Sequence, residues 1–235
     1  MNTRMQNKEK RRQRILFEAR RVLTREGYDA LTTRGLAKAA GVTQPTLYNL
    51  IGSKDDILRV LLEESVARVW ERLNQLEASD PLEAIEAVTI EPLKLFEADE
   101  TYHRAAVISS DHLHGALATG DDIEEQNFVG RESAQMATLA AQSAIDAGLL
   151  RGRIPASVFG EQMYICFRGP MRDWAYGFIS LEEFRARALR GFYMTLAIDA
   201  TPAFKTVLER KTVALLKGDQ SSTPIKSTKQ ARRET

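Results

Sequence analysis

The sequence contains a single cysteine, Cys166, among its 235 residues. One cysteine excludes an internal disulfide framework and a multi-cysteine zinc site, which fits a reducing compartment. No segment approaches the roughly 18 uninterrupted apolar residues expected of a membrane span. The basic start, MNTRMQNKEKRRQRILFEAR, has no apolar stretch of signal-peptide length behind it. We therefore expect a soluble, cytoplasmic globular protein with no membrane partner.

The signatures of common enzymes are also missing. We find no nucleophile elbow, phosphate-binding loop or metal-ligand cluster, so we expect no catalytic residue and no cofactor. An enzyme would have to use isolated side chains such as His103, Asp111, His112, His114 or Cys166. His112 and His114 are two residues apart, which suits a loop better than one helix face, and we expect no metal there.

The net charge of +1 conceals an uneven distribution along the chain. Residues 1–56 carry 12 Lys and Arg against 6 Asp and Glu, a net charge of +6, whereas residues 57–217 carry 17 against 24, a net charge of −7. A basic segment joined to an acidic one predicts a polyanionic partner, because neutralising phosphates releases counterions and drives nucleic-acid binding. A merely solvated run of charges explains the same composition.

Apolar residues recur at spacings of three and four almost throughout, and no alternating strand pattern persists, so the sequence predicts an all-α protein. We expect an N-terminal domain over 1–52, a larger helical domain over 53–217 with helix 53–77 as connector, and a polar, disordered tail over 218–235. The helices predicted, to within a few residues, cover 8–26, 33–40, 44–51, 53–77, 81–98, 100–110, 122–147, 156–178, 181–198 and 203–216, with 111–120 as an irregular connection.

Residues 33–52, TRGLAKAAGVTQPTLYNLIG, have the pattern of a helix-turn-helix. Gly41 supplies the turn, Thr32 or Thr33 can cap the helix before it, and Thr43 can cap the helix after it. Small and apolar side chains lie at the spacings that pack two short helices together. Ser53-Lys54-Asp55-Asp56 then forms a capping-box pattern, with Asp in place of Glu, at the start of the connecting helix.

The stretch from about Arg12 to Leu62 closely resembles the N-terminal domain of the TetR family of transcription regulators. The resemblance rests on four short motifs: Ala30-Leu31-Thr32-Thr33, Ala37 to Gly41, Thr43-Gln44-Pro45-Thr46-Leu47-Tyr48, and Ser53-Lys54. Two positions depart from the family pattern. Ile51 stands where an aromatic residue is usual, and Asn49 where histidine or tyrosine is often found, so the operator sequence does not follow by analogy.

The resemblance implies that the second helix of the motif lies in the major groove of DNA. Gln44 and Thr46 are then candidates for contacts to base edges, and Pro45 for a contact to a thymine methyl. Tyr48 and Asn49 would reach phosphates, as would Thr33, Arg34 and Lys54 at the starts of neighbouring helices. Thr33 as a cap, Tyr48 as a packed ring and Lys54 as a solvated side chain are the alternatives. Arg11, Arg12 and Arg14 would form a basic N-terminal arm or only a flexible tail.

The same resemblance implies a homodimer and a ligand-binding C-terminal domain. The expected dimer helices, 156–178 and 181–198, carry an apolar stripe that can face a partner or the subunit's own core; its members are Phe159, Leu181, Phe184, Ala188, Phe192 and Leu196. A largely apolar small-molecule effector would contact side chains that can equally be simple core residues: Trp70, Phe96, Tyr102, His103, Phe128, Met136, Met163, Phe167, Met171 and Trp174.

We therefore predict a repressor that binds a palindromic double-stranded DNA operator as a dimer and releases it when the effector binds. An activator of the same type and an interaction protein that has lost operator recognition are the alternatives. An enzyme is the least favoured class.

Overall fold

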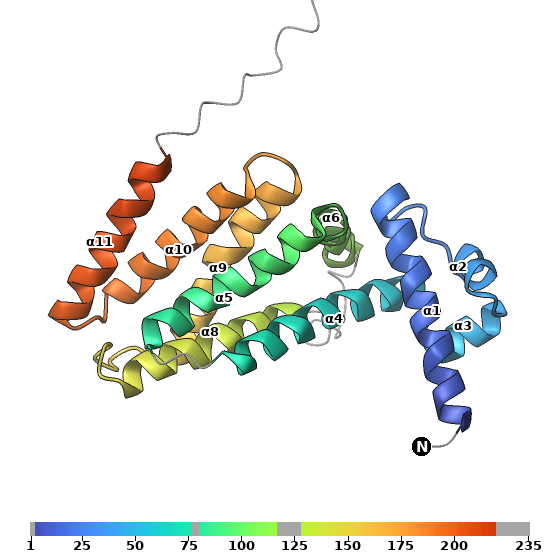
Figure 1. Cartoon of the computed structure of the whole chain (residues 1–235), viewed down its shortest axis with the longest axis horizontal. Coiled ribbons are helices and arrows are strands. Elements are labelled where there is room, and N and C mark those ends of the chain that lie inside the picture. Colours follow the sequence, from blue (N-terminus) through green and yellow to red (C-terminus); the bar gives the residue numbers. More distant parts are fainter. Residues whose placement is uncertain (1–2, 77–79, 117–127, 220–235) are drawn as a thin grey trace, which may run out of the picture.

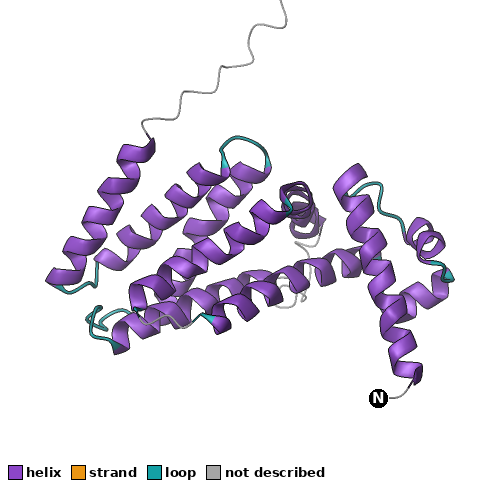
Figure 2. Ribbon diagram, in the orientation of Figure 1, coloured by secondary structure: helices purple, strands orange, loops and turns teal. Residues whose placement is uncertain are grey.

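The structure is a computed structural model that describes residues 3–76, 80–116 and 128–219. Within these ranges the regular elements are helices (Figure 2), and the only extended pairing is an isolated bridge between Leu150 and Ala200. The prediction of an all-α protein is confirmed. None of the helices in the described ranges is long and apolar enough to cross a membrane.

The N-terminal head consists of α1 (Thr3–Glu26), α2 (Thr33–Ala40) and α3 (Gln44–Leu50). Thr32 caps α2 by accepting a hydrogen bond from the Gly35 amide, and Thr43 caps α3 in the same way from the Thr46 amide. Between them Gly41 adopts φ 65°, the left-handed conformation that glycine tolerates best. The turn and caps that the sequence predicted therefore set the relation of the two short helices.

The connecting helix α4 (Lys54–Gln75) begins with the predicted capping box. The Ser53 hydroxyl accepts a hydrogen bond from the Asp56 amide at 3.1 Å, and the Asp56 carboxylate accepts one from the Ser53 amide at 2.7 Å. Helix α4 then extends from the head into the larger C-terminal body (Figure 1). Its first turns share the head's core through Ile57, Leu58 and Leu61, which are fully buried.

The body contains α5 (Pro81–Ala98), α6 (Glu100–Ala116), α8 (Phe128–Asp146), α9 (Ala156–Ala175), α10 (Leu181–Ala197) and α11 (Pro202–Asp219). Its most extensive helix pair is α8 with α9, and α10 lies between α9 and α11. Gly160 permits the first of these contacts, because a Cβ there would lie 2.6 Å from the Ala134 carbonyl oxygen. The body thus ends at α11, at the opposite end of the molecule from the head (Figure 1).

Four helix boundaries differ from the sequence expectation by three residues or more. Helix α9 ends at Ala175, three residues before the predicted end. Helix α1 begins at Thr3 rather than near Lys8, five residues before the predicted start. Helix α6 continues to Ala116, so residues 111–116 are helical rather than irregular, and α11 continues to Asp219. At the start of α1, residues 4–7 are exposed, so helix propensity and continuity with the following turns account for the extension there. The rest of the expected connection, and the expected tail from residue 220 onward, lie outside the described residues.

Candidate nucleic-acid interface

Helix α3 separates a buried side from an exposed side. Leu47 is fully buried in the head's core. Gln44, Pro45, Tyr48 and Asn49 are exposed, and the Tyr48 ring retains 49% of its accessible surface. The predicted base-contacting and phosphate-contacting residues of this helix therefore share one outward face, with Thr46 half-buried beside them.

Hydrogen bonds join the starts of α2 and α3 on this face. The Gln44 side-chain amide donates to the Thr33 hydroxyl across 3.1 Å, and the hydroxyls of Thr43 and Thr46 lie 2.8 Å apart. Thr33 is the first residue of α2 rather than its cap, since Thr32 holds that role. Gln44 and Thr46 thus have local partners that hold their side chains in place before any contact with a base.

Cationic side chains flank the recognition helix. Arg34 is exposed on α2, and Lys54 at the start of α4 places its ammonium 3.9 Å from the centroid of the Tyr28 ring. The Tyr28 hydroxyl donates a hydrogen bond to the Asp55 carboxylate. Burial and that hydrogen bond raise the pKa of Tyr28, so the phenol remains protonated and keeps the donor it needs. Lys54 therefore has a fixed support rather than being a freely solvated side chain.

Contacts between α1, α4 and α6 join the head to the body. Arg20 of α1 forms an ion pair with Glu64 of α4 and lies 5.9 Å from the centroid of the Tyr102 ring on α6. Tyr102 is 4% exposed and packs in the head's core. These contacts join α6 directly to α1, the helix that packs against α3.

The body contains an aromatic cluster formed by Phe96, His103, Phe167, Trp174 and Phe184. Phe96 stacks on Trp174 with ring centroids 5.1 Å apart, and its ring centroid is 5.0 Å from that of His103. The centroid of the Phe184 ring is 6.2 Å from that of Trp174 and 5.0 Å from that of Phe167. Burial lowers the pKa of His103 to about 4, so this imidazole is neutral near pH 7.

Several polar atoms in the body are buried without a hydrogen-bond partner. They include the Trp174 indole nitrogen, the Tyr102 hydroxyl and the Thr89 hydroxyl. An unsatisfied buried donor costs about 1–3 kcal/mol, so native proteins usually pair such groups with protein atoms or water. A bound molecule with a polar group can satisfy the same need. The core of the body therefore contains a few unpartnered polar atoms among mainly apolar side chains.

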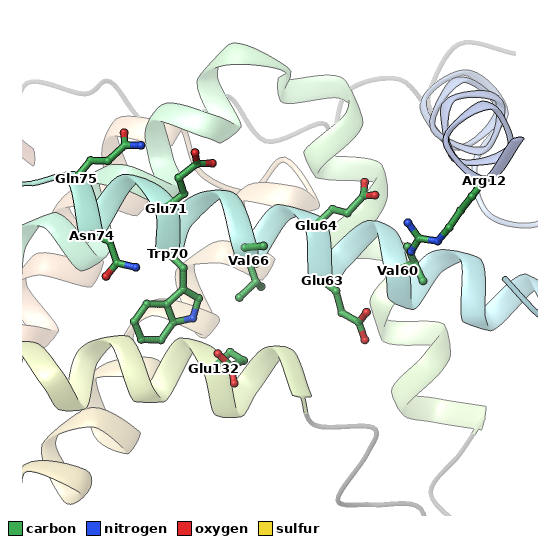
Figure 3. A pocket seen from close by; sticks show the side chains of 11 residues that line it. Arg12, Val60, Glu63, Glu64, Val66, Trp70, Glu71, Asn74, Gln75 and Glu132 are labelled. Carbon is green, nitrogen blue, oxygen red and sulfur yellow. The ribbon is translucent and has the colours of Figure 1, made fainter. Parts of the chain in front are cut away.

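A separate open hollow of about 700 Å³ lies along α4 where it faces α8. Figure 3 shows Trp70 pointing toward the α8 turn that carries Glu132, with Glu63 directed toward the same space. The lining contains Glu63, Glu64, Glu71 and Glu132 against one cation, Arg12. Two lining residues were predicted to be functional from the sequence, Trp70 as an effector contact and Arg12 as part of the basic arm. The carboxylates were missed because the expected effector contacts were largely apolar.

The predicted effector residues do not all meet. Phe96, His103, Phe167 and Trp174 lie in the aromatic cluster, Met136 and Met171 pack in the same part of the core, and Tyr102 touches His103. Met163 lies in a different core, Trp70 lines the open hollow, and the side chain of Phe128 lies outside the described residues. The side chains of Asp111, His112 and His114 also lie outside them. Among the described residues no group of His, Cys, Asp or Glu is arranged to bind a metal.

Most of the predicted dimer residues point into the subunit's own core. Phe159, Phe184, Ala188, Phe192 and Leu196 are between 0% and 2% exposed in the single subunit, and Leu181 is half-buried. The buried five offer no surface to a partner, because the apolar stripe packs inward against the same chain. The exposed apolar side chains of α9 and α10 are instead Val158, Ile165 and Met194, with Ile198 just beyond the end of α10.

These features define a helix-turn-helix protein with a helical C-terminal body. Residues 15–61 match the family model described as "Bacterial regulatory proteins, tetR family". No curated protein matches the chain in sequence. The matched segment covers the helix-turn-helix head and the first turns of α4, and solved TetR regulators share the fold over most of the chain.

Solved structures share the fold at low sequence identity. A TetR transcriptional regulator from Rhodococcus sp. RHA1 is 18% identical with a TM-score of 0.61, covering 81% of this chain and 97% of its own. FadR of Thermus thermophilus, a TetR-family repressor solved with lauroyl-CoA, is 17% identical with a TM-score of 0.64 and the same coverage. SmeT, which represses the SmeDEF multidrug efflux pump of Stenotrophomonas maltophilia, is 17% identical with a TM-score of 0.62, covering 82% and 92%. SmeT has also been solved in complex with triclosan.

Proposed function

We propose that this chain represses transcription as a homodimer bound to a palindromic operator and that a small molecule releases it. The observation that carries the proposal is the outward face of α3, where exposed polar side chains oppose the buried Leu47. The major groove of B-DNA accepts an α-helix and distinguishes the base pairs, so this face is suited to sequence reading. Solved repressors of the same fold, FadR and SmeT, support repression rather than activation.

In this proposal Gln44 and Thr46 contact base edges and Pro45 a thymine methyl. The phosphate contacts come from Thr33, Arg34, Tyr48, Asn49 and Lys54. Gln44 is well placed for its role, because its amide is already held by Thr33 and an oriented amide can bond an adenine edge in two places. The contacts to phosphates fix the register and do not read sequence.

The test begins with duplexes selected by the full-length protein from a random-sequence pool. Binding of fluorescently labelled selected and scrambled duplexes is then measured by anisotropy at several salt concentrations. We expect Gln44→Ala to change the preferred sequence at one position per half-site, and Lys54→Ala to weaken selected and scrambled duplexes alike. Failure of the wild-type protein to enrich any sequence would overturn operator binding and favour a protein that has lost recognition.

We place the dimer surface on the exposed face of α9 and α10. The Cys166 sulfur lies 3.9 Å from the Thr195 hydroxyl, which sets the turn carrying Ile165 beside the turn carrying Met194. Ile165 is 60% exposed, Met194 67% and Ile198 69%. Exposed apolar side chains gathered in this way mark an interaction site, and a two-fold dimer doubles the DNA sequence that one short helix can read.

Ile165→Glu combined with Met194→Glu tests this surface. We expect the variant to sediment as a folded monomer at concentrations where the wild type is a dimer, and to lose most of its operator affinity. The matched control is Val213→Glu combined with Leu216→Glu, which changes two exposed apolar residues of α11. A double variant of α9 and α10 that stays dimeric would show that the interface lies elsewhere.

We assign the effector to the body's aromatic cluster. The buried, unpartnered indole N–H of Trp174 would meet a polar group of an otherwise apolar molecule. The lauroyl-CoA of FadR and the triclosan of SmeT are molecules of that general character. Contact between His103 and Tyr102 then offers a route from the cluster through α6 to the head.

Trp70 and Trp174 are the only tryptophans in the chain, so fluorescence can separate the two sites. Lauroyl-CoA and triclosan are titrated into the wild type, Trp70→Phe and Trp174→Phe. In Trp70→Phe the remaining emission comes from Trp174, and binding of a probe at the cluster should quench it. The probe should also lower operator affinity, and operator DNA should lower probe affinity by the same factor. Quenching confined to the emission that Trp174→Phe retains would move the effector to the open hollow.

A further inference from the structure

The first turns of α1 extend beyond the head's core as an exposed basic segment. Residues 4–14 precede Ile15, the first core side chain, and all are exposed except half-buried Arg12. They carry six Lys and Arg against one acid, Glu9. Figure 1 shows this end of α1 projecting past α3, clear of the body.

The charges of this segment are sorted around the helix rather than spread evenly. Arg4, Lys8 and Arg11 follow the spacing of four and three residues that defines one helix face, and the next step along that face is the buried Ile15. The opposite face carries Gln6, Glu9 and Gln13. The Gln13 amide donates to Glu9 across 2.8 Å, and the Arg12 guanidinium lies 3.8 Å from the same carboxylate, so the only acid of the segment contacts residues outside the face of Arg4, Lys8 and Arg11.

The cationic face borders a hollow beside the recognition helix. Its lining consists of Arg4, Met5, Asn7, Lys8 and Arg11 from α1 and Leu50, the last residue of α3, around a volume of about 700 Å³. Three of these side chains are cationic and none is acidic. A solvated charge run gives no reason for the cations to gather on the side that faces α3.

The short length of α3 would place this hollow near the DNA when α3 lies in the major groove. Helix α3 has seven residues, and at a rise of about 1.5 Å per residue it is only about 10 Å long. The major groove is about 12 Å wide and is bordered by the phosphates of both strands. A helix whose exposed face enters that groove therefore brings the hollow at its C-terminal end close to one of the bordering strands.

We infer that Arg4, Lys8 and Arg11 form a second DNA contact, which binds backbone phosphates flanking the bases read by α3. The ligand is the phosphodiester backbone of the same duplex, and the contact carries no base preference of its own. The inference rests on the proposed DNA binding. The sequence predicted a basic arm of Arg11, Arg12 and Arg14 or only a flexible tail, and the inference assigns the contact instead to a helical face of Arg4, Lys8 and Arg11.

The test compares the wild type with the triple variant Arg4→Gln, Lys8→Gln, Arg11→Gln in the full-length protein. The matched control, Arg151→Gln, Lys205→Gln, Arg210→Gln, removes the same charge from exposed positions far from the head. Anisotropy is measured on a duplex selected from a random-sequence pool and on a scrambled duplex, over a series of KCl concentrations. Far-ultraviolet circular dichroism and thermal melting check the fold, which the triple variant should keep because these side chains are exposed.

Affinity falls with salt, so the slope of log affinity against log salt is negative. The triple variant should make this slope shallower by about 2 to 3 per bound subunit, since each lost phosphate contact reduces its magnitude by about 0.9. Its affinity should fall at least tenfold on both duplexes, and their ratio should not change. The charge-retaining variant Arg4→Lys, Lys8→Arg, Arg11→Lys should restore the wild-type slope.

Equal slopes for the triple variant and the control would overturn the inference while leaving the proposed function intact. A changed ratio between selected and scrambled duplexes would overturn the assignment to the backbone alone. A wild-type protein that binds neither duplex would instead overturn both the proposed function and this contact.

Discussion

The recognition surface of the head and the aromatic core of the body treat polar groups differently, although the head also buries the unpartnered Arg20 Nε and the body also pairs Asp199 with Arg153. In the head, polar side chains lie outside a small apolar core and are paired locally, as Thr33 is with Gln44 and Ser53 with Asp56. In the body, polar atoms such as the Trp174 indole nitrogen and the Thr89 hydroxyl are buried and unpartnered. The head therefore presents locally paired polar side chains on its surface, and under the proposed function a ligand would supply partners to the buried groups of the body.

The head and the body also differ in the sign of their net charge. Residues 1–56 carry 12 Lys and Arg against 6 Asp and Glu, and residues 57–217 carry 17 against 24. An acidic body repels a polyanion and so leaves the head as the part that approaches DNA. The two regions meet at α1, α4 and α6, where Arg20 contacts both Glu64 and Tyr102.

Removing the core side chain under the recognition helix should break the head and spare the body. Leu47→Ala deletes a fully buried side chain, and such a truncation costs about 2–5 kcal/mol. We expect calorimetry to show an earlier melting step for the head, a nearly unchanged step for the body, and no operator binding. The matched control is Tyr48→Ala on the exposed side of α3, which should alter stability by less than about 0.5 kcal/mol but still weaken DNA binding. A uniform loss of stability in both regions would show that they fold as one unit.

Lowering the pH should destabilise the body through His103. Its pKa is about 4 in the folded chain against an ordinary value of 6.5 for a solvated histidine, so the unfolded chain binds more protons between these values. Stability is then complete above about pH 6.5 and decreases as the pH falls toward 4. The wild type should lose about 2 kcal/mol more than His103→Gln between pH 7 and pH 5, at about 1.36 kcal/mol per unit of pKa difference. Chemical denaturation of both proteins at the two pH values measures this, and parallel losses would rule out His103 as the origin.

Deleting the cap of α4 should produce a smaller effect at the junction of the two regions. Ser53→Ala removes the hydroxyl that accepts from the Asp56 amide, and loss of such a cap costs about 1 kcal/mol. Burial alone would raise the pKa of Asp56, but the hydrogen bonds from Ser53 lower it, so this contribution is lost in acid as Asp56 becomes protonated. Ser65→Ala is the control on the same helix, because its hydroxyl only donates back to the Leu61 carbonyl. Equal denaturation midpoints for the two variants would contradict a stabilising role for the cap.

The head could be predicted from the sequence because its determinants are local. Gly41, Thr43 and Ser53 act on residues within three or four positions of themselves, and the structure places all three in the predicted roles. The start of α1 was missed, since residues 4–7 are exposed and are helical through propensity and continuity with the anchored turns.

The body could be predicted only as a set of helices. Phe184 and Phe192 occupy apolar positions of a helical stripe, but the stripe alone cannot say whether it faces its own chain or a second copy. The exposed Ile165 and Met194 gave no separate signal. The acidic hollow beside Trp70 was invisible for a similar reason, because it joins α4 to α8 across more than fifty residues of sequence.

The smallest expected effect concerns the support of Lys54, where the head's fixed surface meets the connector. Tyr28→Phe removes the hydrogen bond to Asp55 but keeps the ring under the Lys54 ammonium. We expect a loss of about 0.5 kcal/mol, at the low end for a hydrogen bond because the pair is partly exposed, and an unchanged operator affinity. Tyr28→Ala removes the ring as well and should weaken selected and scrambled duplexes equally, because Lys54 then loses its fixed position. If Tyr28→Phe weakens DNA binding as much as Tyr28→Ala, the hydroxyl and not the ring positions this cation, and the head's surface depends on Asp55 as well.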